Sequence, residues 1–240
     1  MNSSKIKFAN LSKKAHALRN ESLYKEAALN YLNAILIDRN NPESYFWLGI
    51  CCKNLKQYSK AISYFEKAVK LKEDYFDAFF ELGICYQIEG KNCGAIKNFV
   101  QAIQINPDSP DAILQLGISH ELCEEYDLAL MIYQKLIENS PEFIKAYEQK
   151  SSLLMKMNQY KDALLILNKL LKISPEHYST YAGMGICFEK LGRISQAKRY
   201  YKKFLSLQPL SEQNNFICSR LNEIRKNHKL NTTSLKLSIC

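Results

Sequence analysis

The chain repeats itself with a period of 34 residues, and this period constrains its fold more than any other feature. One column of positions holds alanine in all six repeats: Ala27, Ala61, Ala95, Ala129, Ala163 and Ala197. A second column, twelve residues earlier, holds only small residues: Ala15, Gly49, Gly83, Gly117, Ser151 and Gly185. No insertion or deletion interrupts the phase. The repeat therefore predicts six equivalent units that stack in a row.

Each unit is predicted to form two helices. In the third unit Phe79, Leu82, Gly83 and Tyr86 follow the i, i+3, i+4, i+7 spacing of one helix face. The second half of the unit repeats this spacing, and a proline column then ends the second helix, because proline has no N–H with which to continue it. Four units carry this proline: Pro107, Pro141, Pro175 and Pro209. We expect an all-α fold.

These columns resemble the tetratricopeptide repeat, which has a small residue at position 8, alanine at 20, an aromatic residue at 24 and proline at 32. The resemblance implies a right-handed superhelical solenoid of stacked antiparallel helix pairs. The six units are expected at residues 8–41, 42–75, 76–109, 110–143, 144–177 and 178–211. A C-terminal capping helix is expected at 212–229, with flexible ends at 1–7 and 230–240.

Three cysteines occupy the same position in three units: Cys51, Cys85 and Cys187. The other units have Ala17, Ser119 and Leu153 there. Equivalent helices of neighbouring repeats lie about 10 Å apart, whereas a disulfide needs Cα atoms within about 7 Å. We therefore interpret the three cysteines as packing residues of the core and not as redox groups or metal ligands.

Other chemical motifs are scarce. The four histidines are scattered, and the chain has no His-Glu-x-x-His, no Cys-x-x-Cys and no glycine-rich phosphate loop. We expect no catalytic residues, no metal and no cofactor, and hence no enzyme. The N-terminal segment is basic and polar, and no stretch of eighteen apolar residues exists, so we expect no membrane span. Eight cysteines without a secretory signal favour a reducing, cytoplasmic location.

The resemblance also implies that the first helices of the units line a concave groove that binds a peptide or a segment of another protein. The residues expected in this groove are Phe46, Trp47, Ile50, Phe80, Ile84, Leu114 and Ile118. Acidic residues are expected at its rim: Glu43, Asp77, Glu81 and Asp111. This composition predicts a hydrophobic and basic ligand segment. In the alternative interpretation, the isoleucines belong to the core between adjacent first helices.

Some members of the family hold the acidic C-terminal tails of chaperones with a clamp of lysine, arginine and asparagine. Asp77 and Glu81 stand where this clamp has cations. A carboxylate in those places repels a carboxylate ligand. A chaperone tail is therefore not an expected partner.

Basic residues accumulate at the C-terminal end, where residues 190–240 hold eleven Lys and Arg against two Glu. Four of them lie together on the second helix of the sixth unit: Lys198, Arg199, Lys202 and Lys203. One hypothesis is that they bind nucleic acid or another polyanion, including an anionic surface. The alternative hypothesis is that these four residues belong to an ordinary solvated helix face. The sequence shows no interleaved exposed aromatic residues, which favours the solvated face.

Overall fold

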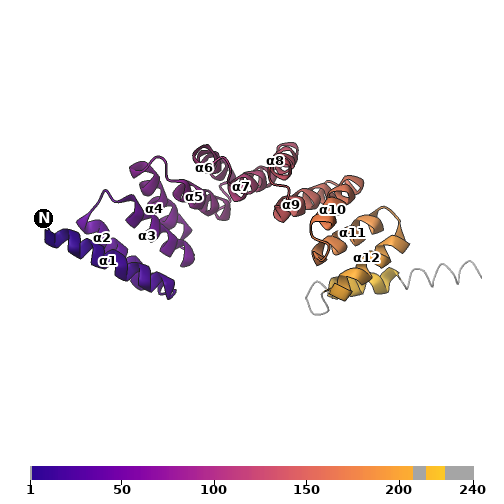
Figure 1. The fold of residues 1–240 in the computed structure, drawn as a ribbon, viewed down its shortest axis with the longest axis horizontal. Coiled ribbons are helices and arrows are strands. Elements are labelled where there is room, and N and C mark those ends of the chain that lie inside the picture. Colours follow the sequence, from indigo (N-terminus) through magenta and orange to yellow (C-terminus); the bar gives the residue numbers. More distant parts are fainter. Residues whose placement is uncertain (1, 208–214, 225–240) are drawn as a thin grey trace, which may run out of the picture. The chain divides into compact units, whose positions relative to one another are not determined.

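The computed structural model describes residues 2–207 and 215–224, and all regular elements in these residues are α-helices (Figure 1). The twelve bounded helices are α1 Asn2–Asn20, α2 Tyr24–Ile37, α3 Pro42–Asn54, α4 Tyr58–Leu71, α5 Phe76–Ile88, α6 Asn92–Ile105, α7 Pro110–Leu122, α8 Tyr126–Asn139, α9 Ile144–Lys156, α10 Tyr160–Ile173, α11 Tyr178–Lys190 and α12 Ile194–Leu207. Residues 215–224 are also helical. The prediction of an all-α helical repeat is thus confirmed.

The two ends differ in part from the prediction. Residues 2–7, which we expected to be flexible, belong to α1, so the first helix begins well before the first repeat. The helical residues 215–224 fall inside the predicted capping helix. The remaining residues of that prediction, and the predicted C-terminal tail, lie outside the described residues.

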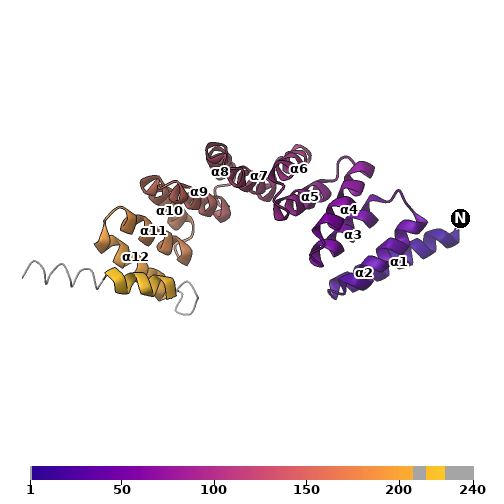
Figure 2. The same cartoon turned by 180° about the vertical axis from the view of Figure 1, so that it is seen from behind.

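The chain divides into two compact units, residues 1–132 and 133–240. In unit 1 the helix pairs α1/α2, α3/α4 and α5/α6 follow one another, and each second helix also packs on the first helix of the next pair (Figures 1 and 2). In unit 2, α9 packs against α10 and α11 against α12 in the same way. Within each unit the helices therefore pack in the same pattern, in which consecutive helices contact each other.

In the pairs α3/α4 and α5/α6, the core forms where a glycine meets an aromatic ring. A Cβ atom built on Gly49 would lie 2.6 Å from Phe65, and one on Gly83 would lie 2.6 Å from Phe99. Both rings are fully buried, as are the alanines of the alanine column. Any side chain at the glycine positions would push the two helices apart, because the interior is already close-packed. Residues of the two small-residue columns thus lie where the two helices of a pair contact each other.

The second helices end at the same position whether or not proline follows. Helices α6, α8 and α10 end two residues before Pro107, Pro141 and Pro175 respectively. Helices α2 and α4 end at the same repeat position although the proline column holds Arg39 and Glu73 there. Proline therefore reinforces a helix end that the packing of the next pair already requires.

Two residues after each first helix, one residue adopts the left-handed backbone conformation. This regularity was not predicted. The six residues have φ values between 59° and 74°: Ser22, Lys56, Gly90, Glu124, Asn158 and Gly192. Around Gly90 the N–H of Lys91 donates to the carbonyl of Tyr86, and that of Gly90 donates to the carbonyl of Gln87. These two bonds define a Schellman C-cap, which turns the chain into the second helix.

The cysteines of the repeated triplet are packing residues, as predicted. Cys51, Cys85 and Cys187 are free thiols with no exposed surface. Burial raises the pKa of the Cys51 and Cys85 thiols to about 12 and that of Cys187 to about 11. These thiols therefore stay protonated at neutral pH.

Candidate functional site

The predicted groove residues of unit 1 separate into two sets. Phe46 and Leu114 are only 5% and 4% exposed, so their assignment to an accessible groove was wrong. The ring of Phe46 packs against Phe65 on its own second helix, with centroids 5.7 Å apart. The remaining predicted groove residues stay partly exposed: Trp47, Ile50, Phe80, Ile84 and Ile118.

Phe80 is intermediate between these two sets. Its ring packs against Phe99 of the second helix at 5.8 Å and stacks on Phe76 at 6.0 Å. One edge of the ring is thus held by the core, while the rest of the side chain is partly accessible. Phe80 can contact a ligand only with that remaining surface.

Trp47 lies between two repeats. Its ring meets His16 of α1 edge to face at 5.5 Å, and the Arg19 guanidinium lies 3.8 Å above its centroid. The His16 ring nitrogen Nδ1 is hydrogen-bonded to the hydroxyl of Tyr31 at 2.9 Å. Burial, and then the charge of Arg19, lower the pKa of His16 below its usual value, so this ring is neutral at pH 7.

The Arg19–Trp47 contact belongs to a regular series along unit 1. In each case the residue at position 12 of one 34-residue repeat contacts the residue at position 6 of the next repeat, and both residues lie on first helices. Lys53 pairs with Glu81, with Nζ and Oε2 2.5 Å apart, and Gln87 donates to the carbonyl of Gln115 at 3.2 Å. This series joins successive first helices on the face that carries the predicted groove.

The series also changes the charge of the predicted acidic rim. Lys53 neutralises Glu81, so Glu81 offers no free negative charge to a ligand. Glu43 and Asp77 are exposed, and neither has a cationic partner among the described residues. Burial raises the pKa of the Tyr75 hydroxyl, and the nearby carboxylates of Glu43 and Asp77 raise it further. Two free carboxylates thus lie near Tyr75.

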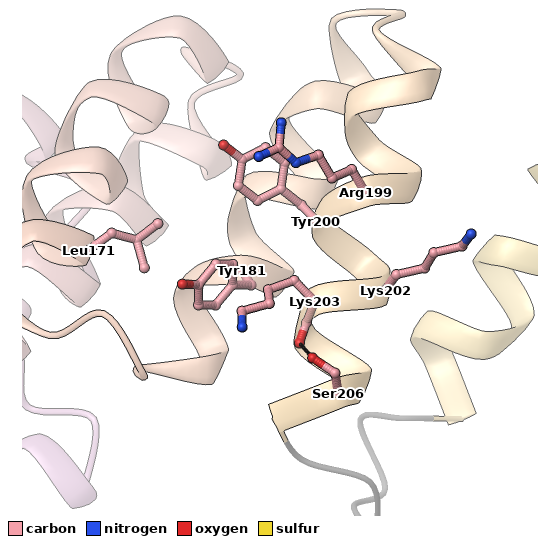
Figure 3. Close-up of a pocket in the computed structure, with 7 residues that line it drawn as sticks. All are labelled: Leu171, Tyr181, Arg199, Tyr200, Lys202, Lys203 and Ser206. Atoms are coloured by element: carbon pink, nitrogen blue, oxygen red, sulfur yellow. Dashed lines mark hydrogen bonds between the residues drawn. The ribbon is translucent and has the colours of Figure 1, made fainter.

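The basic residues of unit 2 occupy a different kind of surface. Arg199, Lys202 and Lys203 line a cavity of about 540 Å³, whereas Lys198 is partly buried and lies outside it. Tyr181 and Tyr200 line the same cavity (Figure 3). The basic residues thus have two aromatic neighbours, which our interpretation of the sequence did not include. Tyr181 comes from another helix of the pair, so its proximity is a consequence of packing.

Metal-binding clusters and membrane-spanning helices are both absent from the described residues. No group of three or more His, Cys, Asp or Glu in residues 2–207 and 215–224 is placed to hold a metal ion. Among the helices of those same ranges, none has both the length and the apolar character needed to cross a membrane.

The helix pairs, their 34-residue period and their small-residue contacts define a helical repeat scaffold. Three models of the tetratricopeptide repeat match the chain, at residues 42–75, 111–142 and 154–213, which together exceed half of its length. The chain belongs to the tetratricopeptide repeat family. This fold is a general scaffold for protein interaction and is of a non-enzymatic type.

Solved structures share this fold at low sequence identity. The C-terminal part of a tetratricopeptide repeat protein from Cytophaga hutchinsonii is 19% identical with a TM-score of 0.72, over 81% of this chain and 78% of that one. PilF of Pseudomonas aeruginosa is 12% identical with a TM-score of 0.69, over 91% and 100%. YrrB, described as a TPR protein with an unusual peptide-binding site, is 18% identical with a TM-score of 0.62, over 80% and 97%. No curated protein sequence matches the chain significantly.

Proposed function

We propose that unit 1 binds a segment of a partner protein along the face formed by α3, α5 and α7. The observation that carries the proposal is one column of isoleucines, Ile50, Ile84 and Ile118, at the same position of three successive repeats. Each keeps part of its surface exposed after folding. Covering apolar surface is favourable by about 25 cal/mol per Å², so a ligand that covers this column gains affinity from it.

The repeat spacing restricts the ligand. First helices of adjacent repeats lie about 10 Å apart, so successive isoleucines present contact points at about that interval. An extended segment in the polyproline II conformation rises about 3.1 Å per residue with three residues per turn, so every third side chain lies on one face and meets these points. An α-helix rises about 1.5 Å per residue and meets them with every seventh. Either form needs apolar side chains at a regular interval.

Charge indicates the second property of the ligand. Glu43 and Asp77 are exposed carboxylates at the edge of this face and lack cationic partners among the described residues. Lysine or arginine in the ligand would be attracted to them. The preferred ligand is therefore an apolar segment that also carries positive charge.

A peptide-display selection against the intact chain tests the proposal. We expect enriched peptides to combine lysine or arginine with apolar residues at a fixed interval. Binding of a selected peptide is then measured by the fluorescence of Trp47, which is the only tryptophan. The double variant Ile84→Gln/Ile118→Gln should weaken binding at least about tenfold, a loss of about 1.4 kcal/mol.

The matched control is Val100→Gln, which changes a partly exposed apolar residue on the second helix α6. This variant should bind like the wild type. Asp77→Asn should reduce the salt dependence of binding, because a rim charge acts mainly through long-range attraction. Equal losses in the isoleucine variant and in the control would place the binding surface elsewhere and refute the proposal.

A further inference from the structure

The cavity of unit 2 is a second candidate binding site, separate from the isoleucine column of unit 1. Its lining comes from three helices: Leu171 of α10, Tyr181 of α11, and Arg199, Tyr200, Lys202, Lys203 and Ser206 of α12. In α12 the residues Arg199, Lys202, Lys203 and Ser206 follow i, i+3, i+4 and i+7 and so share one helix face. The cavity thus has one polar, basic wall.

Among the described residues, no carboxylate compensates the charge of this wall. Helix α12 contains four cations and no carboxylate. None of Arg199, Lys202 and Lys203 pairs with a carboxylate among the described residues. Cations three or four residues apart on a helix repel one another. An anionic ligand would relieve this repulsion.

The other walls are aromatic and apolar, and they are held in place. Tyr200 stacks on Phe188 with ring centroids 5.1 Å apart and an interplanar angle of 18°. The hydroxyl of Tyr181 donates to the carbonyl of Pro175 at 2.7 Å. Figure 3 shows the side chains of Arg199 and Lys203 beside these two rings, whereas Lys202 extends away from them. The site therefore combines two cations with fixed aromatic surfaces.

We propose that this cavity binds an acidic peptide segment in which carboxylates flank an aromatic or aliphatic side chain. The carboxylates pair with Arg199 and Lys203, and the apolar side chain lies against Tyr181, Tyr200 and Leu171. A cavity of about 540 Å³ accommodates a few side chains. The helix dipole also favours cations in the second half of α12, but it does not account for the aromatic walls. A peptide is favoured over nucleic acid because the fold is a scaffold for protein interaction.

A direct binding assay tests the site with defined probes. The probe is a short fluorescein-labelled peptide in which glutamates flank a central phenylalanine, titrated with the full chain at an ionic strength of about 0.15 M. Arg199→Gln/Lys203→Gln should raise its Kd at least about tenfold, as expected for the loss of two charge-assisted contacts. The control peptide has glutamine in place of glutamate and should not bind measurably.

The matched control variant is Lys190→Gln/Arg193→Gln. These two exposed cations belong to the same repeat and carry the same total charge, but they do not line the cavity. This variant should change the Kd less than about threefold, the effect of a change in net charge alone. Equal losses in the two double variants would show a diffuse electrostatic attraction and overturn the site.

Two other results would also overturn the proposal. One is a wild-type chain that does not bind the acidic peptide. The other is an oligothymidylate that displaces the peptide and binds more tightly than it does, which would identify a nucleic-acid site. None of these results depends on the isoleucine column, so the two proposals fail independently.

Discussion

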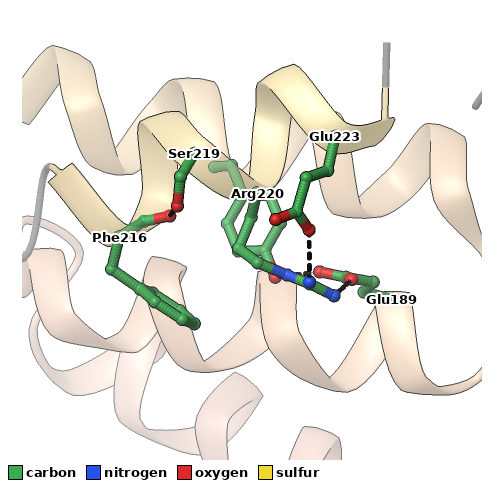
Figure 4. Close-up of polar contacts among 6 residues, drawn as sticks. Glu189, Phe216, Ser219, Arg220 and Glu223 are labelled. Carbon is green, nitrogen blue, oxygen red and sulfur yellow. Dashed lines mark hydrogen bonds and ion pairs between the residues drawn. The ribbon is translucent and has the colours of Figure 1, made fainter. Parts of the chain in front are cut away.

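The guanidinium group of Arg220 donates a hydrogen bond to the carboxylate of Glu189 and so connects the helical residues 215–224 to α11 (Figure 4). The same carboxylate accepts a hydrogen bond from the Tyr201 hydroxyl of α12 at 2.7 Å. Arg220 also pairs with Glu223, one turn further on, at 2.6 Å. Glu189 thus joins the last helix pair to the segment that follows it, and its side chain is only 13% exposed.

The apolar face of residues 215–224 should contribute more stability than this ion pair. Ile217 is 2% exposed, whereas its neighbour Phe216 is 54% exposed. Ile217→Ala should lower the free energy of unfolding by about 2–5 kcal/mol, the usual result of truncating a buried aliphatic side chain. Phe216→Ala should stay within about 0.5 kcal/mol. Chemical denaturation followed by circular dichroism measures both, and similar losses would mean that this face does not cover the end of the repeat.

The contact between Gly83 and Phe99 should show strong coupling. Gly83→Ala places a Cβ 2.6 Å from the Phe99 ring, and overpacking of this kind costs about 1–3 kcal/mol. In a Phe99→Leu background the added methyl group has more room, so the same substitution should cost less. A double-mutant cycle of unfolding free energies measures the difference. Additive losses would show that the glycine does not serve this contact.

The left-handed column predicts opposite effects at two equivalent positions. Gly90→Ala forces a Cβ into the left-handed region and should cost about 1–2 kcal/mol. Lys56→Gly removes such strain and should stabilise the protein by up to about 1 kcal/mol. Part of the gain is offset because glycine also gives the unfolded chain more conformational freedom. Thermal unfolding of both variants is the measurement. A destabilised Lys56→Gly would contradict the strain argument.

These cases show which features the sequence could predict. The 34-residue period, the buried alanines and the helix pairs follow from columns that keep one residue type through the chain. The column of left-handed residues was missed because only Gly90 and Gly192 are glycine. The other four residues do not by themselves indicate a positive φ: Ser22, Lys56, Glu124 and Asn158. The packing of the repeat imposes the turn even where the residue type does not favour it.

The candidate sites were harder to predict because they depend on contacts between helices. Phe46 and Phe80 occupy the same repeat position, yet the first is buried and the second is partly exposed. The difference arises from neighbours such as Tyr75, whose ring packs against Phe46 at 5.1 Å. Tyr181 and Arg199 are eighteen residues apart and meet only through packing. Helical spacing alone cannot supply such information.

Stability should decline in alkaline solution because buried thiols must lose a proton. The pKa of the thiols of Cys51 and Cys85 rises through burial from 9.0 to about 12. Their contribution is fully present below pH 9 and is lost as pH rises from 9 towards 12. The unfolding free energy should therefore fall over this range, and Cys51→Ala/Cys85→Ala should show a shallower fall. An identical pH dependence in the variant would contradict this assignment.

The last prediction concerns the cover of Trp47. Arg19 lies 3.8 Å above the indole centroid, and a contact of this kind contributes about 0.5–1 kcal/mol at a partly exposed site. Arg19→Ala should expose one ring face, shift the emission of Trp47 to longer wavelength and increase its quenching by acrylamide. Arg19→Met is the control, because it removes the charge but keeps an apolar chain over the ring. It should leave the quenching close to that of the wild type. If Arg19→Ala does not change the emission, another group covers the indole, and the Arg19–Trp47 contact does not shape the proposed binding face of unit 1.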